Sequence, residues 1–279
     1  MSAVTGTRPG LRKGAPAPVT VAGPVTQARV IRAEWTKLRA LRSTRWSALS
    51  AIVLIVGLGA VIAGSGTPYR ISGSNTAAVG ISTALLGVLF AQLMVGMVGV
   101  LAFSGEYGTG MIRATLAAVP SRLPVLWAKV IVLAGLVLPV TLLCAFLDYF
   151  VATAIASSRG GSAFSLSDPG VLRTVVGSSL YLTVMVIIGL ALGALLRKTA
   201  AGLAVFAAVF FVIPIIVPLL PQRVSGFALY LPTNAGGALW GDPQTTAHAL
   251  SPWTGFACLC GYAIVLTALA AWQLRRRDA

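Results

Sequence analysis

Long apolar runs separated by short polar segments dominate the pattern of this chain. A helix that crosses a membrane needs about 20 mostly apolar residues. Six windows meet this requirement, at residues 46–64, 82–103, 125–156, 172–196, 201–220 and 253–274. The pattern therefore predicts an all-α integral membrane protein with six transmembrane helices.

The residues before the first window show two different patterns. Residues 1–24 are rich in Gly, Pro, Ala and Thr without periodicity, which predicts a disordered cytoplasmic tail. From residue 25, helical spacing places basic residues on one side and an apolar stripe on the other. The stripe consists of Ile31, Trp35, Leu38 and Leu41. This predicts an amphipathic interfacial helix. Glu34, Arg42 and Arg45 interrupt the stripe, so a basic segment without regular helix stays an alternative.

Composition and charge agree with a membrane protein and predict its orientation. Of 279 residues, 57% are hydrophobic and only 10% are charged, which is too apolar for a water-soluble globule. Seventeen of the 21 lysines and arginines fall on one side of the predicted topology. Because cytoplasmic segments retain positive charge, we expect both termini in the cytoplasm and the chain in the plasma membrane.

The net charge of +15 raises the question of nucleic-acid binding. The basic residues sit at the ends of apolar windows, and the sequence predicts no soluble domain that would form a groove. Topology and contact with anionic membrane lipids explain the charge better. We therefore expect lipids, and no nucleic acid, as partners of the basic residues.

The segment 221–252 is the longest outer connection. It contains YLPTNAGGALW, in which Thr233 or Asn234 is a candidate helix N-cap after a proline. Its apolar residues predict a short re-entrant hairpin in the outer leaflet, formed by Leu231, Pro232, Asn234 and Trp240. Backbone at that depth must be shielded by protein, so the hairpin should pack against the other helices.

Two features inside the windows concern helix packing. Gly189 and Gly193 have the G-x-x-x-G spacing that lets two helices approach closely. Pro214 and Pro218 each remove a backbone hydrogen bond, which favours a kink in the fifth helix.

The inventory of reactive residues argues against an enzyme. The only histidine, His248, lies in an outer loop without a neighbouring cluster for a metal or a catalytic triad. None of the four lysines has the Gly-Lys-Ser/Thr context of an ATP-binding Walker loop. Asp148 lies roughly 28 Å along a helix from Lys129, near the outer surface, which gives little support to an ion-coupled carrier. We expect no catalytic residue, metal or cofactor in this chain.

The largest inner loop, residues 105–124, interrupts the apolar pattern with a compact polar segment. Two glycines flank Thr109 as a turn and candidate cap, and MIRATLAAV then has helical spacing up to Pro120. One face of this helix holds Ile112, Thr115, Leu116 and Val119. About ten residues form a rod roughly 15 Å long, which fits a groove on a partner protein. The alternative is a short interfacial helix packed on its own bundle.

The order of these segments resembles one family. A basic amphipathic stretch, RVIRAEWTKLRALRSTRW, comes first, and FSGEYGTGMIRATLAAVPSRLPVLWAK follows the second window. The stretch YLPTNAGGALW then precedes the last window. This order is similar to that of the membrane subunit, or permease, of type-2 ABC exporters, and the similarity covers residues 25–277.

The resemblance implies a six-helix permease domain at residues 25–279 that pairs with a second, identical or different, permease subunit. A separate ATPase subunit would bind ATP and magnesium and energise export. Residues 30–42 would be an elbow helix along the inner surface, and 227–240 the re-entrant hairpin. Residues 110–119 would be a coupling helix, and the ATPase contact would involve Glu106, Thr109, Met111, Ile112, Arg113, Leu116, Val119 and Arg122.

The near absence of charge within the windows predicts an apolar or amphipathic cargo. Two alternatives remain for function. One is an ABC-type complex with a sensing or membrane-organising role, and the other is an ion-coupled secondary carrier.

Overall fold

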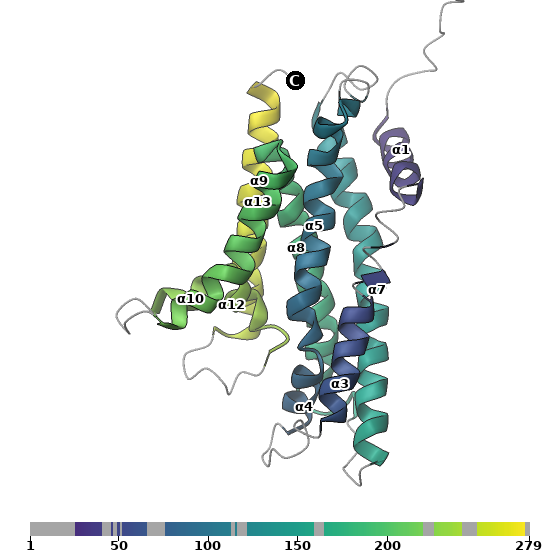
Figure 1. Ribbon diagram of the computed structural model, residues 1–279, viewed down its shortest axis with the longest axis vertical. Helices are drawn as coiled ribbons and strands as arrows, with labels where there is room; N and C mark the ends of the chain where they lie inside the picture. Colours follow the sequence, from purple (N-terminus) through teal and green to yellow (C-terminus); the bar gives the residue numbers. More distant parts are fainter. Residues whose placement is uncertain are drawn as a thin grey trace, which may run out of the picture.

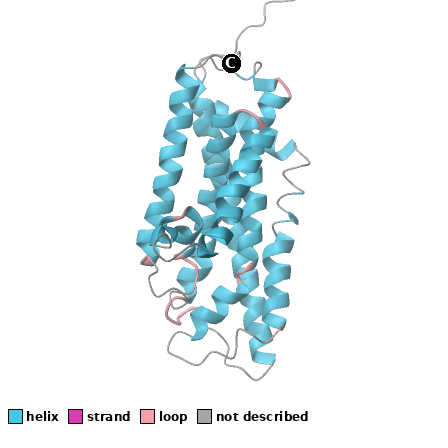
Figure 2. Cartoon of the chain, turned by 60° about the vertical axis from the view of Figure 1, so that its left-hand side comes forward, coloured by secondary structure: helices cyan, strands magenta, loops and turns pink. Residues whose placement is uncertain are grey.

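The computed structural model describes residues 26–40, 46, 49–50, 52–65, 76–112, 115, 122–158, 165–219, 226–241 and 250–276. These residues form helices joined by turns and loops, with no strand among them (Figure 2). Several sequence predictions lie outside the described residues: the tail 1–24, Leu41, Arg113, Leu116, Val119 and His248.

Five helices are long and apolar enough to cross a membrane. Four are α5 (Gly87–Gly108), α7 (Arg122–Ser158), α8 (Val171–Leu196) and α13 (Pro252–Arg276). The fifth runs through α9 (Thr199–Ala207), the π-helix η3 (Ala208–Val212) and α10 (Ile213–Ile216). The prediction of a helical multi-pass membrane protein is confirmed at this level.

The first predicted window is described only in part. It contains the π-helix η1 (Val53–Gly57) and α3 (Leu58–Gly64), whose apolar part, Val53–Ile62, is shorter than a full span. The described residues therefore hold five span-length helices and not the predicted six.

The predicted bounds of the second helix, 82–103, are wrong at both ends. A turn at Leu85 and Leu86 separates α4 (Thr76–Ala84) from α5, which continues to Gly108. The helix passes through Glu106 without ending, because two lysines neutralise this carboxylate. The charge that appeared to close the apolar window is part of the helix.

The helix α7 has 37 residues and contains Pro139. At 1.5 Å per residue it is about 55 Å long, whereas the hydrocarbon core of a bilayer is about 30 Å thick. It therefore extends well beyond the apolar layer.

The helices α5, α7 and α13 surround α8, which is the most buried span (Figure 1). One end of the bundle, at the top of Figure 1, holds the last turns of α5, α8 and α13 and the first turns of α7 and α9. Arg197 and Lys198 follow α8 there, and Arg275 and Arg276 end α13. We call this end the basic end.

Glycines bring α5 and α8 into backbone contact. A Cβ atom at Gly189 would lie 2.2 Å from the carbonyl oxygen of Gly96, and one at Gly193 would lie 2.5 Å from that of Val100. Such distances are far below van der Waals contact. The G-x-x-x-G spacing thus serves packing within this chain.

A proline shapes the fifth span. Pro214 has no N–H, so the carbonyl of Phe210 lacks its usual helical donor. Gln92 Nε2 and Thr233 Oγ1 each donate a hydrogen bond to this oxygen at 3.3 Å. Tyr181 Oη donates in turn to Gln92 Oε1. The expected kink is present, since α10 bends away from α9 (Figure 1), and side chains from two other elements hold it.

The outer segment folds onto the bundle as the helices η5 (Gly226–Tyr230) and α12 (Pro232–Gly237). The predicted cap is wrong, because the N-cap residue is Leu231 and no side chain caps α12. Asn234 Nδ2 donates instead to the carbonyl of Ala228 at 2.8 Å. Trp240 is buried and packs on Tyr181. Most of α12 is thus shielded by protein, whereas Phe227 and Tyr230 of η5 are exposed, and the depth of the segment in the membrane stays a prediction.

Candidate functional site

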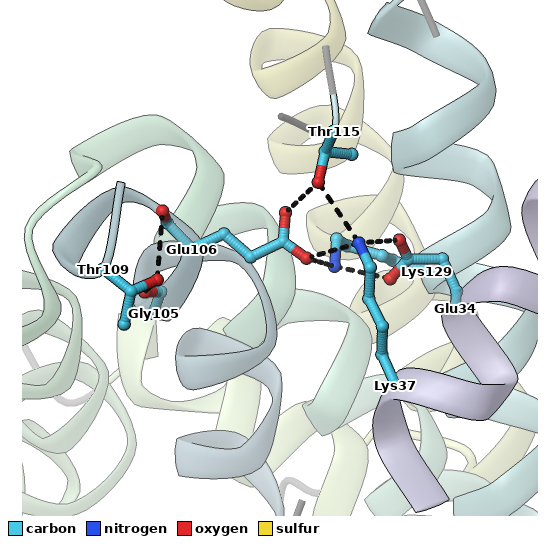
Figure 3. Close-up of polar contacts among 7 residues, drawn as sticks. All are labelled: Glu34, Lys37, Gly105, Glu106, Thr109, Thr115 and Lys129. Atoms are coloured by element: carbon cyan, nitrogen blue, oxygen red, sulfur yellow. Dashed lines mark hydrogen bonds and ion pairs between the residues drawn. The ribbon is translucent and has the colours of Figure 1, made fainter. Parts of the chain in front are cut away.

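Four charged side chains meet at the basic end, and we call them the four-charge cluster: Glu34, Lys37, Glu106 and Lys129 (Figure 3). Glu34 and Lys37 come from α1 (Gln27–Ala40), Glu106 from the last turn of α5, and Lys129 from the second turn of α7. The cluster therefore joins three helices that are distant in sequence.

The helix α1 lies alongside the first turns of α7. At one end, Gln27 Nε2 donates to the carbonyl of Pro124 at 3.1 Å, and further along Glu34 reaches Lys129. Contacts thus advance in the same direction along both helices. An orientation of α1 along the inner membrane surface stays a prediction.

The face that α1 turns to the bundle differs from the predicted stripe. Val30, Glu34 and Leu38 are buried, whereas Trp35 is 38% exposed at the edge and Ile31 is half-buried. The buried face is rotated because Glu34 lies at its centre. A carboxylate can occupy this position because lysines pair with it.

Each lysine of the four-charge cluster contacts both glutamates. Lys129 Nζ lies 2.6 Å from Glu34 Oε2 and 2.7 Å from Glu106 Oε1. Lys37 Nζ lies 2.8 Å from Glu34 Oε1 and 3.1 Å from Glu106 Oε1. Glu34, Lys129 and Glu106 are 3%, 5% and 6% exposed. Three of the four charges are therefore buried, and the partly exposed Lys37 makes the group neutral, which is the condition under which burial of charge is tolerated.

Lys37 is the cluster member nearest to water. Burial alone would lower the pKa of Lys37, but the hydrogen bond and charge of Glu34, together with Glu106, raise it above its ordinary value. A raised pKa means that the contribution of Lys37 to stability is complete below the unfolded pKa. It is lost only as the pH rises through the folded value, so Lys37 stays charged at neutral pH.

The chain turns directly after Glu106. Thr109 Oγ1 donates to the carbonyl of Gly105 at 3.0 Å, which satisfies the end of α5 (Figure 3). Gly110 follows with a φ of +72°, a left-handed conformation that glycine adopts without strain. Thr109 thus closes α5, and its predicted role as a cap of the following helix stays a prediction.

The described part of the 110–119 segment contacts its own chain. Thr115 Oγ1 accepts a hydrogen bond from Lys37 Nζ at 3.2 Å and donates to Glu106 Oε2 at 3.5 Å. Ile112 is buried, whereas Met111 is 43% exposed. Ile112 and Thr115, which were predicted to face a partner together, face the bundle here.

Most members of the cluster are absent from the sequence-predicted site, which includes only Glu106. One signal for Glu34 was present, since this carboxylate interrupts an otherwise apolar stripe. Lys129 stands near the start of an apolar window, a position where lysines are common, so its role had no distinct signal. Arg122, also predicted, is the first residue of α7.

A further buried charge lies toward the other end of α7. Asp148 is 0% exposed, and neither carboxylate oxygen has a hydrogen-bond partner among the described residues. A Cβ atom at Gly59 of α3 would lie 2.0 Å from Asp148 Oδ1. The expectation of almost no buried charge therefore needs correction, because Asp148, Lys129 and Glu106 are all buried.

The four-charge cluster has the chemistry of a structural clamp. Its lysines and carboxylates satisfy one another, and no group of metal-ligating side chains occurs within the described part of the chain. It connects α1 and Thr115 to the ends of α5 and α7. No protein-family model matches the chain, and a search of curated proteins finds no similar sequence.

Proposed function

We propose that the chain is the permease subunit of an exporter that resembles type-2 ABC transporters. It pairs with a second permease subunit, identical or different, and a separate ATPase subunit binds ATP and magnesium. The cargo is an apolar or amphipathic compound. The basic end is cytoplasmic, because Arg197, Lys198, Arg275 and Arg276 gather there.

The observation that carries this proposal is the link between the 105–124 loop and the four-charge cluster. Thr115 contacts both Lys37 and Glu106, so a displacement of the loop acts directly on α1 and α5. Lys129 extends the same link to α7. An ATPase that pushes on this loop would therefore move three elements together, which suits a switch between inward-facing and outward-facing states.

The contact with the ATPase forms on the side of the loop that the bundle leaves open. Met111 is exposed there, and Thr109 is exposed in the preceding turn. Glu106 acts behind this surface by holding the loop to the two lysines. Its role is to position the loop, and the contact itself belongs to the exposed residues.

A charge swap tests this coupling. The full-length chain is reconstituted in nanodiscs with a candidate ATPase, one encoded by a neighbouring gene with a Walker loop, and ATP hydrolysis and complex assembly are measured. Glu106→Lys leaves three cations and one carboxylate in the cluster. We expect about a tenfold loss of the ATP hydrolysis that the chain stimulates in the ATPase. Adding Lys129→Glu restores the charge balance and should recover part of the activity.

Lys198→Glu is the matched control, because Lys198 is exposed at the same end of the bundle. Full stimulation by correctly inserted Glu106→Lys protein would exclude the coupling role. A neighbouring gene without a Walker loop would speak against the exporter. Release of an amphipathic fluorescent dye from ATP-loaded vesicles distinguishes export from a sensing or membrane-organising role.

One observation favours a second candidate, an ion-coupled secondary carrier. Asp148 is a buried carboxylate without a hydrogen-bond partner among the described residues, in a helix suited to cross the membrane. Such groups often carry protons in transporters. This candidate predicts dye accumulation driven by a pH gradient without any ATPase, and loss of accumulation in Asp148→Asn.

A further inference from the structure

We propose that the cleft between α1 and α7 binds one anionic phospholipid. The inference requires that the chain lies in a membrane, but it does not depend on transport. The site is separate from the four-charge cluster, because none of the described residues that line the cleft belongs to that cluster.

The cleft has a volume of about 450 Å³, within the usual range for sites that hold a small ligand. One wall comes from α1 and the other from α7. Its lining consists of Ile31, Arg32, Trp35 and Thr36 from α1, and Ile131, Val132 and Gly135 from α7.

The α7 wall is apolar and open. Gly135 has no side chain, and a Cβ atom built there would meet nothing within 4 Å. Ile131 beside it is half exposed on the outer surface of a helix that is suited to cross the membrane. In a bilayer, apolar side chains at such a surface are covered by acyl chains. The α7 wall therefore fits the tail of a lipid.

The α1 wall is cationic. Arg32 lines the cleft, and the guanidinium of Arg39 lies 5.8 Å from the ring centroid of Trp35. Glu34, which is the one acidic residue of α1, is turned toward the bundle and paired with Lys37 and Lys129. The described residues that line the cleft include Arg32 and no acidic side chain, so a negative headgroup complements this wall.

Tryptophan at the rim supports a lipid as the occupant. The indole of Trp35 lines the cleft and is partly exposed, as is usual for aromatic side chains at the boundary between headgroups and acyl chains. A cation, an aromatic rim and an apolar groove thus follow one another from α1 to α7. This sequence of environments matches the headgroup, interface and tail of one phospholipid.

Fluorescence quenching of Trp35 by brominated lipid tests the site. The full-length chain carries Phe in place of Trp46, Trp127, Trp253 and Trp272, all of which are exposed, and keeps the buried Trp240 as unquenched background. It is placed in phosphatidylcholine nanodiscs that contain a low fraction of brominated lipid. Brominated phosphatidylglycerol is compared with brominated phosphatidylcholine.

We expect brominated phosphatidylglycerol to associate with Trp35 about fivefold more strongly than brominated phosphatidylcholine. Arg32→Gln should abolish the preference, and Arg32→Lys should keep most of it. Gly135→Leu should reduce quenching by both lipids, because its Cβ enters open space and the rest of the side chain fills the groove.

The chain offers a matched control in Trp272. This tryptophan is exposed on α13, and the guanidinium of Arg276 lies 4.5 Å from its ring centroid. A second protein keeps Trp272 and carries Phe at position 35. An equal lipid preference at both tryptophans would show general surface attraction and overturn the site. Unchanged quenching in Gly135→Leu would show that no acyl chain enters the cleft, and would overturn it as well.

Discussion

Glu106 and Asp148 are both buried carboxylates in membrane-suited helices, yet their surroundings differ completely. Glu106 lies against two lysine ammonium groups and a threonine hydroxyl. Asp148 lies against the backbone of α3, and both of its oxygens are without a hydrogen-bond partner within the described part of the chain. The first is held by charge, and the second is held by packing alone.

The difference decides what each group can do. A carboxylate between two lysines is stable in its ionised form, and removal of one partner is expensive because the remaining charges stay buried. A carboxylate without a partner is costly to bury in its ionised form, so a neutral replacement removes a penalty. The four-charge cluster is thus suited to hold helices together, whereas Asp148 is suited to change its charge.

The largest expected effect comes from breaking the cluster. Lys129→Met leaves Glu34 and Glu106 buried together with Lys37 alone, and we expect a loss of about 3–5 kcal/mol in the free energy of unfolding. Chemical unfolding of the detergent-solubilised chain measures this loss. Lys198→Met, an exposed lysine at the same end, should cost less than about 0.5 kcal/mol.

A triple variant sharpens this result. Glu34→Leu, Glu106→Leu and Lys129→Met together remove three of the four charges and leave no buried carboxylate in the cluster. Because no unpaired buried carboxylate remains, the triple variant should lose less stability than Lys129→Met alone. A triple variant that is less stable than the single one would mean that the cluster contributes net favourable energy beyond mutual neutralisation.

An intermediate effect is expected at the contact between α3 and Asp148. Gly59→Ala places a methyl group on the carboxylate, and we expect a loss of about 1–3 kcal/mol, measured in the same unfolding assay. Adding Asp148→Ala should relieve the overlap and recover most of the loss. Gly64→Ala, in the same helix with nothing within 4 Å of the new methyl, should be nearly neutral.

The smallest effect is expected for Asp148→Asn, which keeps the shape and removes the ionisable group. We expect its thermal unfolding midpoint to equal or slightly exceed that of the unmodified chain. Glu106→Gln, the same chemical change at the paired site, should lower the midpoint clearly. Equal losses in the two variants would contradict the distinction between paired and unpaired carboxylates.

The apolar windows predicted most of the fold, because 20-residue runs of apolar side chains have few other structures available in a membrane. The predicted ends of the second helix were wrong, since a window cannot show that Glu106 is neutralised. The partners that neutralise it, Lys37 and Lys129, lie on other helices. Their contribution depends on tertiary contact and has no local pattern.

The candidate site was predictable from the sequence only where a charged residue interrupts an apolar helix face. Glu34 stood on an apolar stripe, and this conflict marked the residue that turns α1 toward α7. Asp148 also interrupts an apolar run, but the sequence around it does not show that the carboxylate is buried without a partner among the described residues. Its burial arises because Gly59 of α3 lets the backbone approach, which the sequence of α7 does not encode.

Lys129 and Asp148 belong to one helix, α7, and Pro139 lies about midway between them. A helix bends more easily at a proline than elsewhere, because proline has no N–H to donate to the preceding turn. The helix α7 therefore links the four-charge cluster, at Lys129, to a carboxylate that can change its charge, at Asp148. Pro139 is the point between them where the helix bends most easily. If movement of the 105–124 loop rotates the first half of α7, the rotation moves Asp148 only when the helix does not bend at Pro139.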